Sequence, residues 1–265
     1  MKTIAPSSSL LIVWIALVAG CAEPARFPSG RVVDLTYPFD STTIYWPTEP
    51  PFRYERNTEG VTEAGHWYAS GRFAAAEHGG THIDAPFHFW EAGSKLDAID
   101  PGRLIGPGIV VDVSRSCGKD PDYLVTVDDL LGWEKRNGKI PDGAIVLLKT
   151  GFGAFYPRRD RYLGTAEMGA AAVAKLHFPG LHPDAARWIA TQRSIGAIGL
   201  DTASIDRGQS VDFGSHIALF EHDIPALENI ANLSDLPEVG FDIIALPMKI
   251  GGGTGGPLRI VAILP

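Results

Sequence analysis

The sequence predicts a single α/β domain, because strand-like and helix-like segments alternate along the chain. The 20 prolines and 30 glycines are spread over the 265 residues, which is typical of many turns between short elements. β-branched runs bounded by such turn residues are the strand candidates. They are residues 31–37, 108–114, 144–150, 195–201, 242–250 and 259–264. No fixed-period repeat divides the sequence, so we expect one domain over residues 29–265.

Two segments between these strands carry helix start signals. Residues 126–137 open with Thr126 as the expected N-cap and with Asp129 three residues further on. Residues 183–193 begin with Pro183, which suits the first position of a helix. We therefore expect a helix in both segments.

The start of the chain has the pattern of a secretion signal. Lys2 precedes an apolar run of about 11 residues, "LLIVWIALVAG", whereas a membrane-spanning helix needs roughly 20. The run ends in "VAGC", which resembles the lipobox of bacterial lipoproteins. We interpret residues 1–21 as a signal peptide with a lipobox that ends at Cys21, and residues 22–28 as a tether.

This interpretation predicts where the protein resides. A lipidated Cys21 would place it in the bacterial cell envelope, facing the periplasm or on the outer membrane, with the lipid as its only membrane attachment. The alternative is a cytoplasmic protein whose signal is not used. Cys117 would then be the only cysteine of the mature domain, which excludes an intrachain disulfide and a cysteine-rich metal site.

Charge and glycine patterning exclude two binding functions. The net charge is −8, and no run of Lys or Arg is longer than the Arg158–Arg159 pair, so nucleic acid is not an expected partner. The "GGGTGG" of residues 251–256 satisfies G-x-G-x-x-G, but only a strand-like segment follows it, where a dinucleotide site needs a helix. We expect residues 251–256 to be a loop that joins two strands.

The stretch "HGGTHIDAPFHF", residues 78–89, concentrates three of the 8 histidines. His78, His82, Asp84 and His88 are separated by even numbers, so an extended backbone projects all four from one face. In a straight strand His78 and His82 would lie about 13 Å apart, too far to share one ion. The chain must therefore bend between them, and Gly79–Gly80 permits such a bend.

These side chains predict a metal site. Imidazole and carboxylate ligands without thiolates suit Zn²⁺ or Mn²⁺, and they are typical of catalytic sites. The alternative is a run of histidines whose ring nitrogens bond backbone carbonyls in a Gly/Pro loop.

At this point the sequence resembles a known family. "HGGTHIDAPFH", residues 78–88, is similar to the HxGTHxDxPxH signature of the cyclase superfamily, which includes bacterial kynurenine formamidase and isatin hydrolase. Residues 45–47, 199–206, 215–233 and 244–259 resemble the other family blocks in the expected order. The resemblance therefore covers essentially the whole mature chain.

The resemblance implies a set of metal ligands. His78, His82 and Asp84 would bind a first ion, and Asp84 would bridge to a second that is also held by His216 and Glu228. Spacing alone leaves two choices open, Glu228 or Glu221 and His216 or His222. The cofactor would be Zn²⁺ or Mn²⁺, one or two ions per subunit, and Gln209 is a possible amide-oxygen ligand in a one-ion site.

The resemblance also implies roles for His88 and Trp46. His88 would be the general acid/base, supplying a proton to the leaving nitrogen of an amide attacked by metal-activated water. The alternative role for His88 is that of a further metal ligand or of a group that hydrogen-bonds a ligand from behind.

Trp46 would stack on the substrate, although by its sequence alone it is equally an ordinary packed aromatic. Asp201 could orient a ligand histidine or cap a turn, and we expect His66, His177 and His182 to be structural or on the surface.

The expected function is a metal-dependent hydrolase of an amide C–N bond in an aryl formamide or a cyclic amide. The alternative is a non-catalytic metal-binding envelope lipoprotein, in which His88 would coordinate the metal and no substrate pocket would persist. The resemblance further implies a swivelling β/β/α fold, a mixed sheet approaching a barrel with flanking helices, and a homodimer or homotetramer. Extra residues at 59–73 depart from the compact formamidase pattern and are expected to reshape the pocket mouth.

Overall fold

The structure is a computed structural model and describes residues 30–265. The predicted signal peptide, its lipobox at Cys21 and the tether lie outside the described residues. The lipid anchor and the envelope location therefore stay predictions. Within residues 30–265, no helix has both the length and the apolar character needed to cross a membrane.

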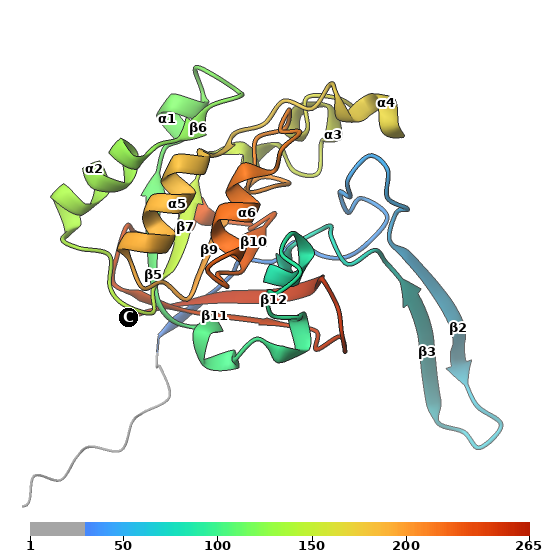
Figure 1. The fold of residues 1–265 in the computed structure, drawn as a ribbon. Coiled ribbons are helices and arrows are strands. Elements are labelled where there is room, and N and C mark those ends of the chain that lie inside the picture. Colours follow the sequence, from blue (N-terminus) through green and yellow to red (C-terminus); the bar gives the residue numbers. More distant parts are fainter. Residues whose placement is uncertain (1–29) are drawn as a thin grey trace, which may run out of the picture.

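A closed mixed sheet forms the centre of the domain (Figure 1). Its strands follow the order β12-β11-β5-β7-β9-β10-β4, and β4 returns to pair with β12, while β1 pairs with another part of β12. The strands are β1 Arg31–Asp34, β4 His82–Asp84, β5 Ile105–Asp112, β7 Ile145–Lys149, β9 Ala197–Leu200, β10 Ala226–Glu228, β11 Phe241–Pro247 and β12 Gly255–Leu264. β5, β7, β9 and β10 run parallel, and the remaining pairs are antiparallel. This confirms the predicted α/β class and the barrel-like mixed sheet.

Alternate side chains of the parallel strands enter two hydrophobic cores. In β7, Ile145 and Leu147 are part of the core inside the barrel, whereas Val146 and Leu148 belong to the core under the helices. Such burial on both faces explains why β7 is an uninterrupted apolar run. The six predicted strand segments all contain strands, although β1 ends at Asp34 and β12 begins at Gly255, earlier than expected.

Helices cover the outside of the sheet (Figure 1). They are α1 Ser114–Cys117, α2 Val127–Asn137, α3 Arg159–Tyr162, α4 Ala170–Val173, α5 Pro183–Gln192 and α6 Gly214–Phe220. Short 3-10 turns occupy Pro86–His88, Leu96–Ala98, Pro101–Leu104, Phe152–Phe155 and Leu233–Asp235. The predicted start signals are confirmed, because Thr126 and Asp129 form a reciprocal capping box and Pro183 begins α5. Sequence periodicity did not predict α6, which is only 7 residues long.

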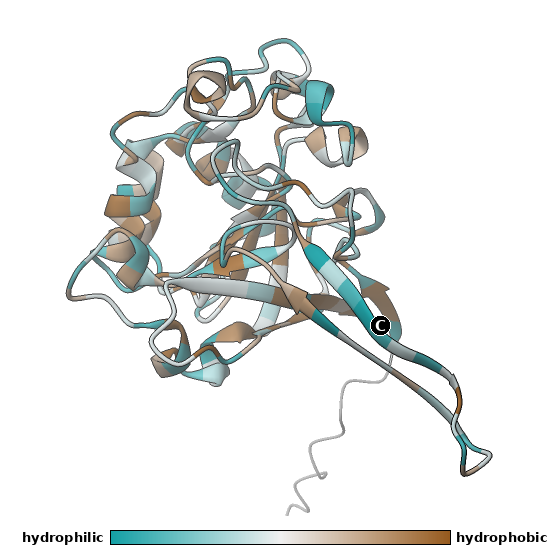
Figure 2. Cartoon of the chain, turned by 90° about the vertical axis from the view of Figure 1, so that its right-hand side faces the viewer, coloured by the Kyte–Doolittle hydropathy of each residue, from teal (hydrophilic) through white to brown (hydrophobic). Residues whose placement is uncertain are grey.

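A two-stranded hairpin projects from the body of the domain (Figures 1 and 2). It consists of β2 Arg53–Val61 and β3 Trp67–Ala74, and it contains the extra residues 59–73 noted in the sequence. Nearly all its side chains are exposed, including the large aromatic Trp67. No strand was predicted there because a hairpin without a buried face lacks the apolar alternation by which strands are recognised. The expected homodimer or homotetramer stays a prediction.

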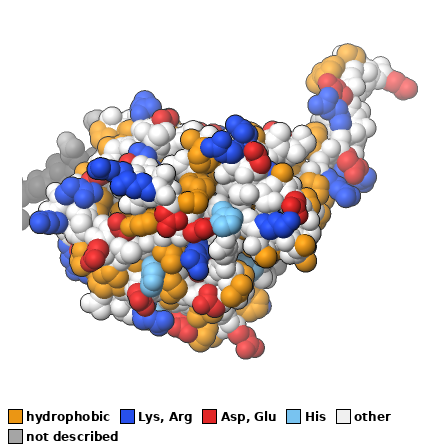
Figure 3. All heavy atoms as spheres, turned by 90° about the horizontal axis from the view of Figure 1, so that it is seen from above, with side chains coloured by type: hydrophobic (Ala, Val, Ile, Leu, Met, Phe, Trp, Pro, Cys, Tyr) orange, Lys and Arg blue, Asp and Glu red, His pale blue; other side chains and the backbone are white. Residues whose placement is uncertain are grey.

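The two signs of charge are intermixed on the surface seen from above (Figure 3). Blue Lys and Arg side chains alternate there with red Asp and Glu side chains. The described residues also include ion pairs such as Arg193 with Glu134 and Lys175 with Glu167. On this face the acidic chain therefore presents mixed charge.

Candidate active site

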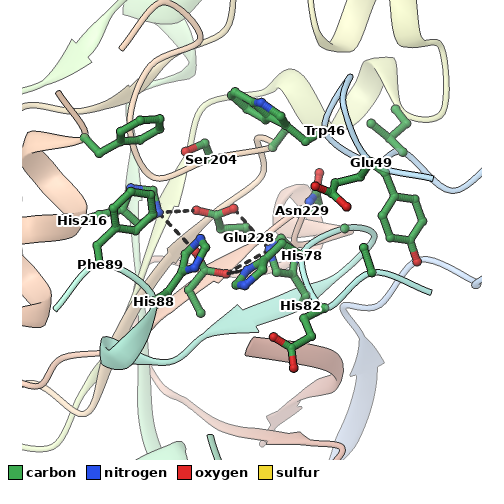
Figure 4. Close-up of a pocket in the computed structure, with 18 residues that line it drawn as sticks. Trp46, Glu49, His78, His82, His88, Phe89, Ser204, His216, Glu228 and Asn229 are labelled. Atoms are coloured by element: carbon green, nitrogen blue, oxygen red, sulfur yellow. Dashed lines mark hydrogen bonds and ion pairs between the residues drawn. The ribbon is translucent and has the colours of Figure 1, made fainter. Parts of the chain in front are cut away.

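A cavity of about 440 Å³ opens at the end of the barrel beside β4, β10 and α6 (Figure 4). Its floor carries histidine and carboxylate side chains, and aromatic rings form part of its walls. The ionisable floor residues are His78, His82, Asp84, His216 and Glu228. The structure therefore gathers in one cavity all five residues that the sequence predicted as metal ligands.

The predicted bend between His78 and His82 is present. The centroids of their rings lie 5.5 Å apart, well under the separation that a straight strand would give. Gly80 has φ 58°, a left-handed conformation that favours glycine, and a side chain on Gly79 would run into the ring of Tyr45. The two glycines thus allow the chain to turn before it enters β4.

Strand pairing then sets the relative positions of the carboxylates. β4 lies between β10 and β12, with His82 opposite Glu228 and Asp84 opposite Gly255. Gly255 leaves room for the neighbouring imidazole, because a Cβ there would lie 2.5 Å from Cε1 of His78. Residues 251–254 join β11 to β12 as expected, whereas Gly255 and Gly256 already belong to β12, where they approach the site closely.

The floor residues fall into two ligand groups that share Asp84. His78, His82 and Asp84 form one group, and Asp84, His216 and Glu228 form the other; within each group the ligand atoms lie within 4.8 Å of one another. Oδ1 of Asp84 lies 2.7 Å from Nδ1 of His78, and its Oδ2 lies 3.2 Å from Nε2 of His216. The two oxygens of one carboxylate thus face two different sets of donors.

The ring of His82 shows that this cluster fits a cation. Its Nδ1 donates to the carbonyl of Gly80 over 2.9 Å, so Nε2 faces the carboxylates. That nitrogen lies 3.0 Å from Oδ1 of Asp84 and 3.4 Å from Oε2 of Glu228, yet it is buried without a hydrogen bond of acceptable geometry. Positive charge is favoured among these atoms, and a divalent cation that takes nitrogen and oxygen ligands would supply it.

The pKa of His82 also indicates that its surroundings favour positive charge. Burial disfavours the charged ring, but Asp84 and Glu228 outweigh this effect and raise the pKa of His82 to about 9. Burial and the charge of Asp84 raise the pKa of Glu228. The carboxylates of this buried cluster therefore need a counter-charge at neutral pH.

Asp206 orients His216 from behind. Its Oδ2 lies 2.6 Å from Nδ1 of His216, and its carboxylate also accepts hydrogen bonds from the backbone N–H groups of Ser215 and His216. Burial alone would raise the pKa of Asp206, but the hydrogen bond with His216 lowers it. This carboxylate fixes the ring so that Nε2 points to Asp84 and Glu228.

Sequence reasoning missed Asp206 and considered Asp201 for this role. In the structure Asp201 instead accepts hydrogen bonds from Thr150 and from the backbone N–H groups of Gly151 and Gly153. It therefore caps the turn after β7, which was the other expectation. Asp206 lies ten residues before His216 in a loop, and that spacing carries no periodic signal that could have identified it.

His88 lies beside the cluster without joining either ligand group. Its ring stacks on that of His78, with centroids 3.8 Å apart and planes 17° apart. Burial, which is the largest effect, and the neighbouring histidines lower the pKa of His88 to about 4 although Asp84 opposes this shift. The imidazole is therefore neutral at neutral pH.

Trp46 and two phenylalanines line the walls of the cavity. Trp46 also packs edge-on against Phe178, with centroids 6.3 Å apart, so it is both a packed aromatic and a wall of the pocket. Phe89 directly follows His88, and Phe213 precedes α6; their ring centroids lie 4.8 Å apart. Sequence reasoning identified neither phenylalanine as a wall residue, although the position of Phe89 next to His88 was a signal for it.

The structure separates the remaining candidates from this cavity. Glu221 and His222 are exposed at the end of α6, so only His216 and Glu228 reach the floor. The interpretation of Gln209 as a ligand is wrong: its Nε2 lies 3.0 Å from the exposed ring of His177, because the turn before α6 directs it outward. His66, His177 and His182 lie outside the cavity, as expected.

The extra residues 59–73 do not shape the mouth of this cavity in the described chain. They form the tip and much of the arm of the projecting hairpin, and none of them lines the cavity. The expectation is wrong because the hairpin pairs only with itself. Ala76 and Glu77, which follow the hairpin, do line the cavity.

Comparisons with known proteins agree with this geometry. The family described as "Putative cyclase" matches residues 33–207. An isatin hydrolase of Roseibium aggregatum is 34% identical over 220 residues, which cover 80% of this chain and 79% of that protein. A kynurenine formamidase of Bacillus thuringiensis is 29% identical, with 86% of this chain and 95% of that protein covered. The solved structure of isatin hydrolase A from Ralstonia solanacearum superposes with a TM-score of 0.79 at 32% identity, covering 89% of this chain and 92% of that one.

Proposed function

The chain belongs to the cyclase family, and on that basis we propose that it is a divalent-metal-dependent hydrolase that cleaves the amide C–N bond of a cyclic aryl amide. One observation carries the proposal: two ligand groups share Asp84 on the floor of a cavity with aromatic side chains in its walls. His88 lies next to these groups, stacked on His78, and belongs to neither of them. The curated relatives named above are hydrolases of isatin and of a formylated kynurenine, which supports an amide as the substrate.

The residues that would hold metal are the two ligand groups. His78, His82 and Asp84 would bind one ion, and Asp84, His216 and Glu228 a second. Their nitrogen and oxygen donors suit Zn²⁺ or Mn²⁺. Such an ion, when bound, polarises a carbonyl and lowers the pKa of water from about 16 toward 7.

His88 would move the proton that amide cleavage requires. Its neutral imidazole can accept a proton from the attacking water and pass it to the amide nitrogen as the C–N bond breaks. The stack with His78 holds the ring at the edge of the ligand cluster. The products of this step are a carboxylate and an amine, which in a cyclic amide remain in one ring-opened molecule.

The lining of the cavity favours a neutral aromatic ring as substrate. The side chains of Trp46, Phe89 and Phe213 offer apolar contact to an aryl group. Among the described residues that line the cavity there is no Lys or Arg, whereas Glu49 and Glu77 are acidic. N-formylkynurenine carries an ammonium group, which Glu49 could pair, and a carboxylate, for which the lining offers no Lys or Arg. A neutral isatin-like lactam leaves no charge unpaired, so we take it as the better fit.

The non-catalytic lipoprotein has less support. That hypothesis requires His88 to coordinate metal and needs no pocket for an organic ligand. The cavity of about 440 Å³ is large enough for a small aromatic molecule, and His88 belongs to neither ligand group. Both features favour an enzyme.

Hydrolysis assays test the proposed function directly. Protein comprising residues 22–265 is loaded in parallel with Zn²⁺ and Mn²⁺ and is assayed by absorbance on isatin and on N-formylkynurenine. We expect turnover of isatin that a chelator abolishes and that added metal restores. Turnover that resists complete removal of metal would contradict the proposal, and preference for N-formylkynurenine would overturn the substrate assignment.

A further inference from the structure

Asn229, which follows the candidate ligand Glu228, has a tightly fixed backbone. Its N–H donates to the carbonyl of Thr202 over 2.8 Å, and its own carbonyl accepts from Oγ1 of Thr81 over 2.7 Å. Asn229 also has φ 53°, a left-handed conformation that few residues other than glycine and asparagine adopt readily. Only 1% of the residue is exposed, so the position of its side chain is set by its surroundings.

Tyr162 fixes the orientation of the side-chain amide of Asn229. The Tyr162 hydroxyl donates to Oδ1 of Asn229 over 2.9 Å, and this is the one hydrogen bond that the described chain offers to that hydroxyl. Tyr162 is fully buried, and burial raises the pKa of its phenol, so the hydroxyl keeps its proton and remains a donor. A flipped amide would leave the hydroxyl proton without an acceptor.

The opposite end of the amide is free. Nδ2 of Asn229 has no hydrogen-bond partner among residues 30–265, and Asn229 is one of the residues that line the cavity (Figure 4). Nδ2 is not among the fully enclosed side-chain atoms without a partner, so it is open to the cavity, where a ligand or a water molecule can accept its hydrogen bond. Its neighbour Glu228 is one of the floor residues where the reacting amide would have to lie.

We propose that Nδ2 of Asn229 donates a hydrogen bond to the carbonyl oxygen of the substrate amide, on which negative charge develops during attack by water. The inference rests on the proposed hydrolase function and adds to it a substrate-contacting residue with its positioning partner, Tyr162. A donor that is already oriented before the substrate arrives stabilises such charge without reorganisation. Asn229 thereby acts on the carbonyl oxygen, while His88 acts on the proton.

Substitution of Asn229 by glycine tests this role while preserving the backbone conformation. Glycine adopts φ 53° at no steric cost, so N229G removes the amide without straining the backbone. We expect kcat/KM to fall about 100-fold, with the bound metal and the pH profile unchanged. The melting temperature should fall by a few degrees, because the buried Tyr162 hydroxyl loses its acceptor. N229D, which keeps an oxygen for Tyr162 but has no N–H group, should lose at least as much.

The positioning role of Tyr162 requires a double-mutant cycle. In Y162F the amide loses its fixed orientation, so kcat/KM should fall by a smaller factor, about 3- to 10-fold. In N229G/Y162F the loss should equal that of N229G alone, because the hydroxyl acts only through the amide. Additive losses would show that Tyr162 acts independently of the Asn229 amide and would overturn its assignment.

A binding measurement provides a readout that does not depend on turnover. The ¹⁵N side-chain amide resonance of Asn229, assigned by its disappearance in N229G, is followed in the Zn²⁺-loaded protein during titration with 2-aminophenylglyoxylate, the ring-opened product of isatin. We expect a downfield shift of one amide proton and weaker binding to N229G by calorimetry.

The outcomes separate this inference from the proposed function. If the wild type hydrolyses amides but N229G retains kcat/KM within threefold, or the ligand binds without moving the resonance, the role of Asn229 is overturned and the hydrolase stands. If the wild type neither hydrolyses amides nor binds the ligand, the proposed function fails and the inference fails with it.

Discussion

The rings of His88 and His78 stack with centroids 3.8 Å apart. The two histidines differ in their partners: His78 bonds both Asp84 and Thr254, whereas His88 belongs to neither ligand group. The two neighbouring imidazoles therefore differ in their surroundings, which is why we propose metal binding for His78 and proton transfer for His88.

His88→Ala is predicted to abolish turnover while metal binding persists. Loss of a general acid/base typically lowers the rate about 100- to 10,000-fold. Metal content by mass spectrometry and kcat on isatin are measured on the same preparation. Parallel loss of metal would show that His88 is a ligand.

Asp206→Asn is predicted to weaken metal binding about 10- to 100-fold. The amide cannot hold the tautomer and orientation of His216 as the carboxylate does at 2.6 Å. Asp201→Asn is the matched control, because Asp201 is an equally buried carboxylate that only caps the turn after β7. The control should lower the melting temperature and leave the metal dissociation constant unchanged; equal metal affinity in both variants would contradict the assignment of Asp206.

Gly255→Ala is predicted to displace His78 and so to lower metal affinity. The new Cβ would lie 2.5 Å from Cε1 of His78 and 2.6 Å from the carbonyl oxygen of Ile83, so the imidazole or β4 must move. Gly251→Ala, in the loop just before β12 and with no atom within 4 Å of its Cβ, is the control. Equilibrium dialysis against metal buffers measures both. Unchanged affinity in the Gly255 variant would show that His78 tolerates displacement and is no tight ligand.

The sequence predicted the parts of this molecule whose physical cause is local. The spacing of His78, His82 and Asp84 requires a bend, and Gly79–Gly80 provides it; Thr126 and Asp129 form the capping box that their spacing indicates. The parallel strands, buried on both faces, were recognisable as continuous apolar runs.

What could not be predicted depends on the tertiary arrangement. The contact of Asp206 with His216 spans a loop of irregular backbone, and the orientation of the Asn229 amide depends on Tyr162, 67 residues earlier. The resemblance to the cyclase family, not spacing, selected His216 and Glu228. The structure explains the choice of histidine, because His216 is buried within α6 and His222 is exposed in the turn after it.

Glu134→Gln is predicted to destabilise the fold in a pH-dependent manner. The pair with Arg193, largely shielded from solvent, lowers the pKa of Glu134 below its usual 4.5. A carboxyl group with a lower pKa in the folded than in the unfolded protein stabilises the fold fully at a pH above its pKa in the unfolded protein. This stabilisation is lost as the pH falls through its pKa in the folded protein. Urea unfolding should show a loss of about 1–2 kcal/mol at pH 7 that shrinks below pH 4.5; a loss independent of pH would contradict the ion pair.

Removal of the carboxylate shared by the two ligand groups tests the central claim most directly. Wild type and D84N, both checked for folding by circular dichroism, are compared for bound Zn²⁺ or Mn²⁺ and for isatin turnover. The account predicts that the wild type binds one or two ions and hydrolyses the amide, and that D84N loses both properties. A folded D84N protein that retains its metal and its activity would contradict it.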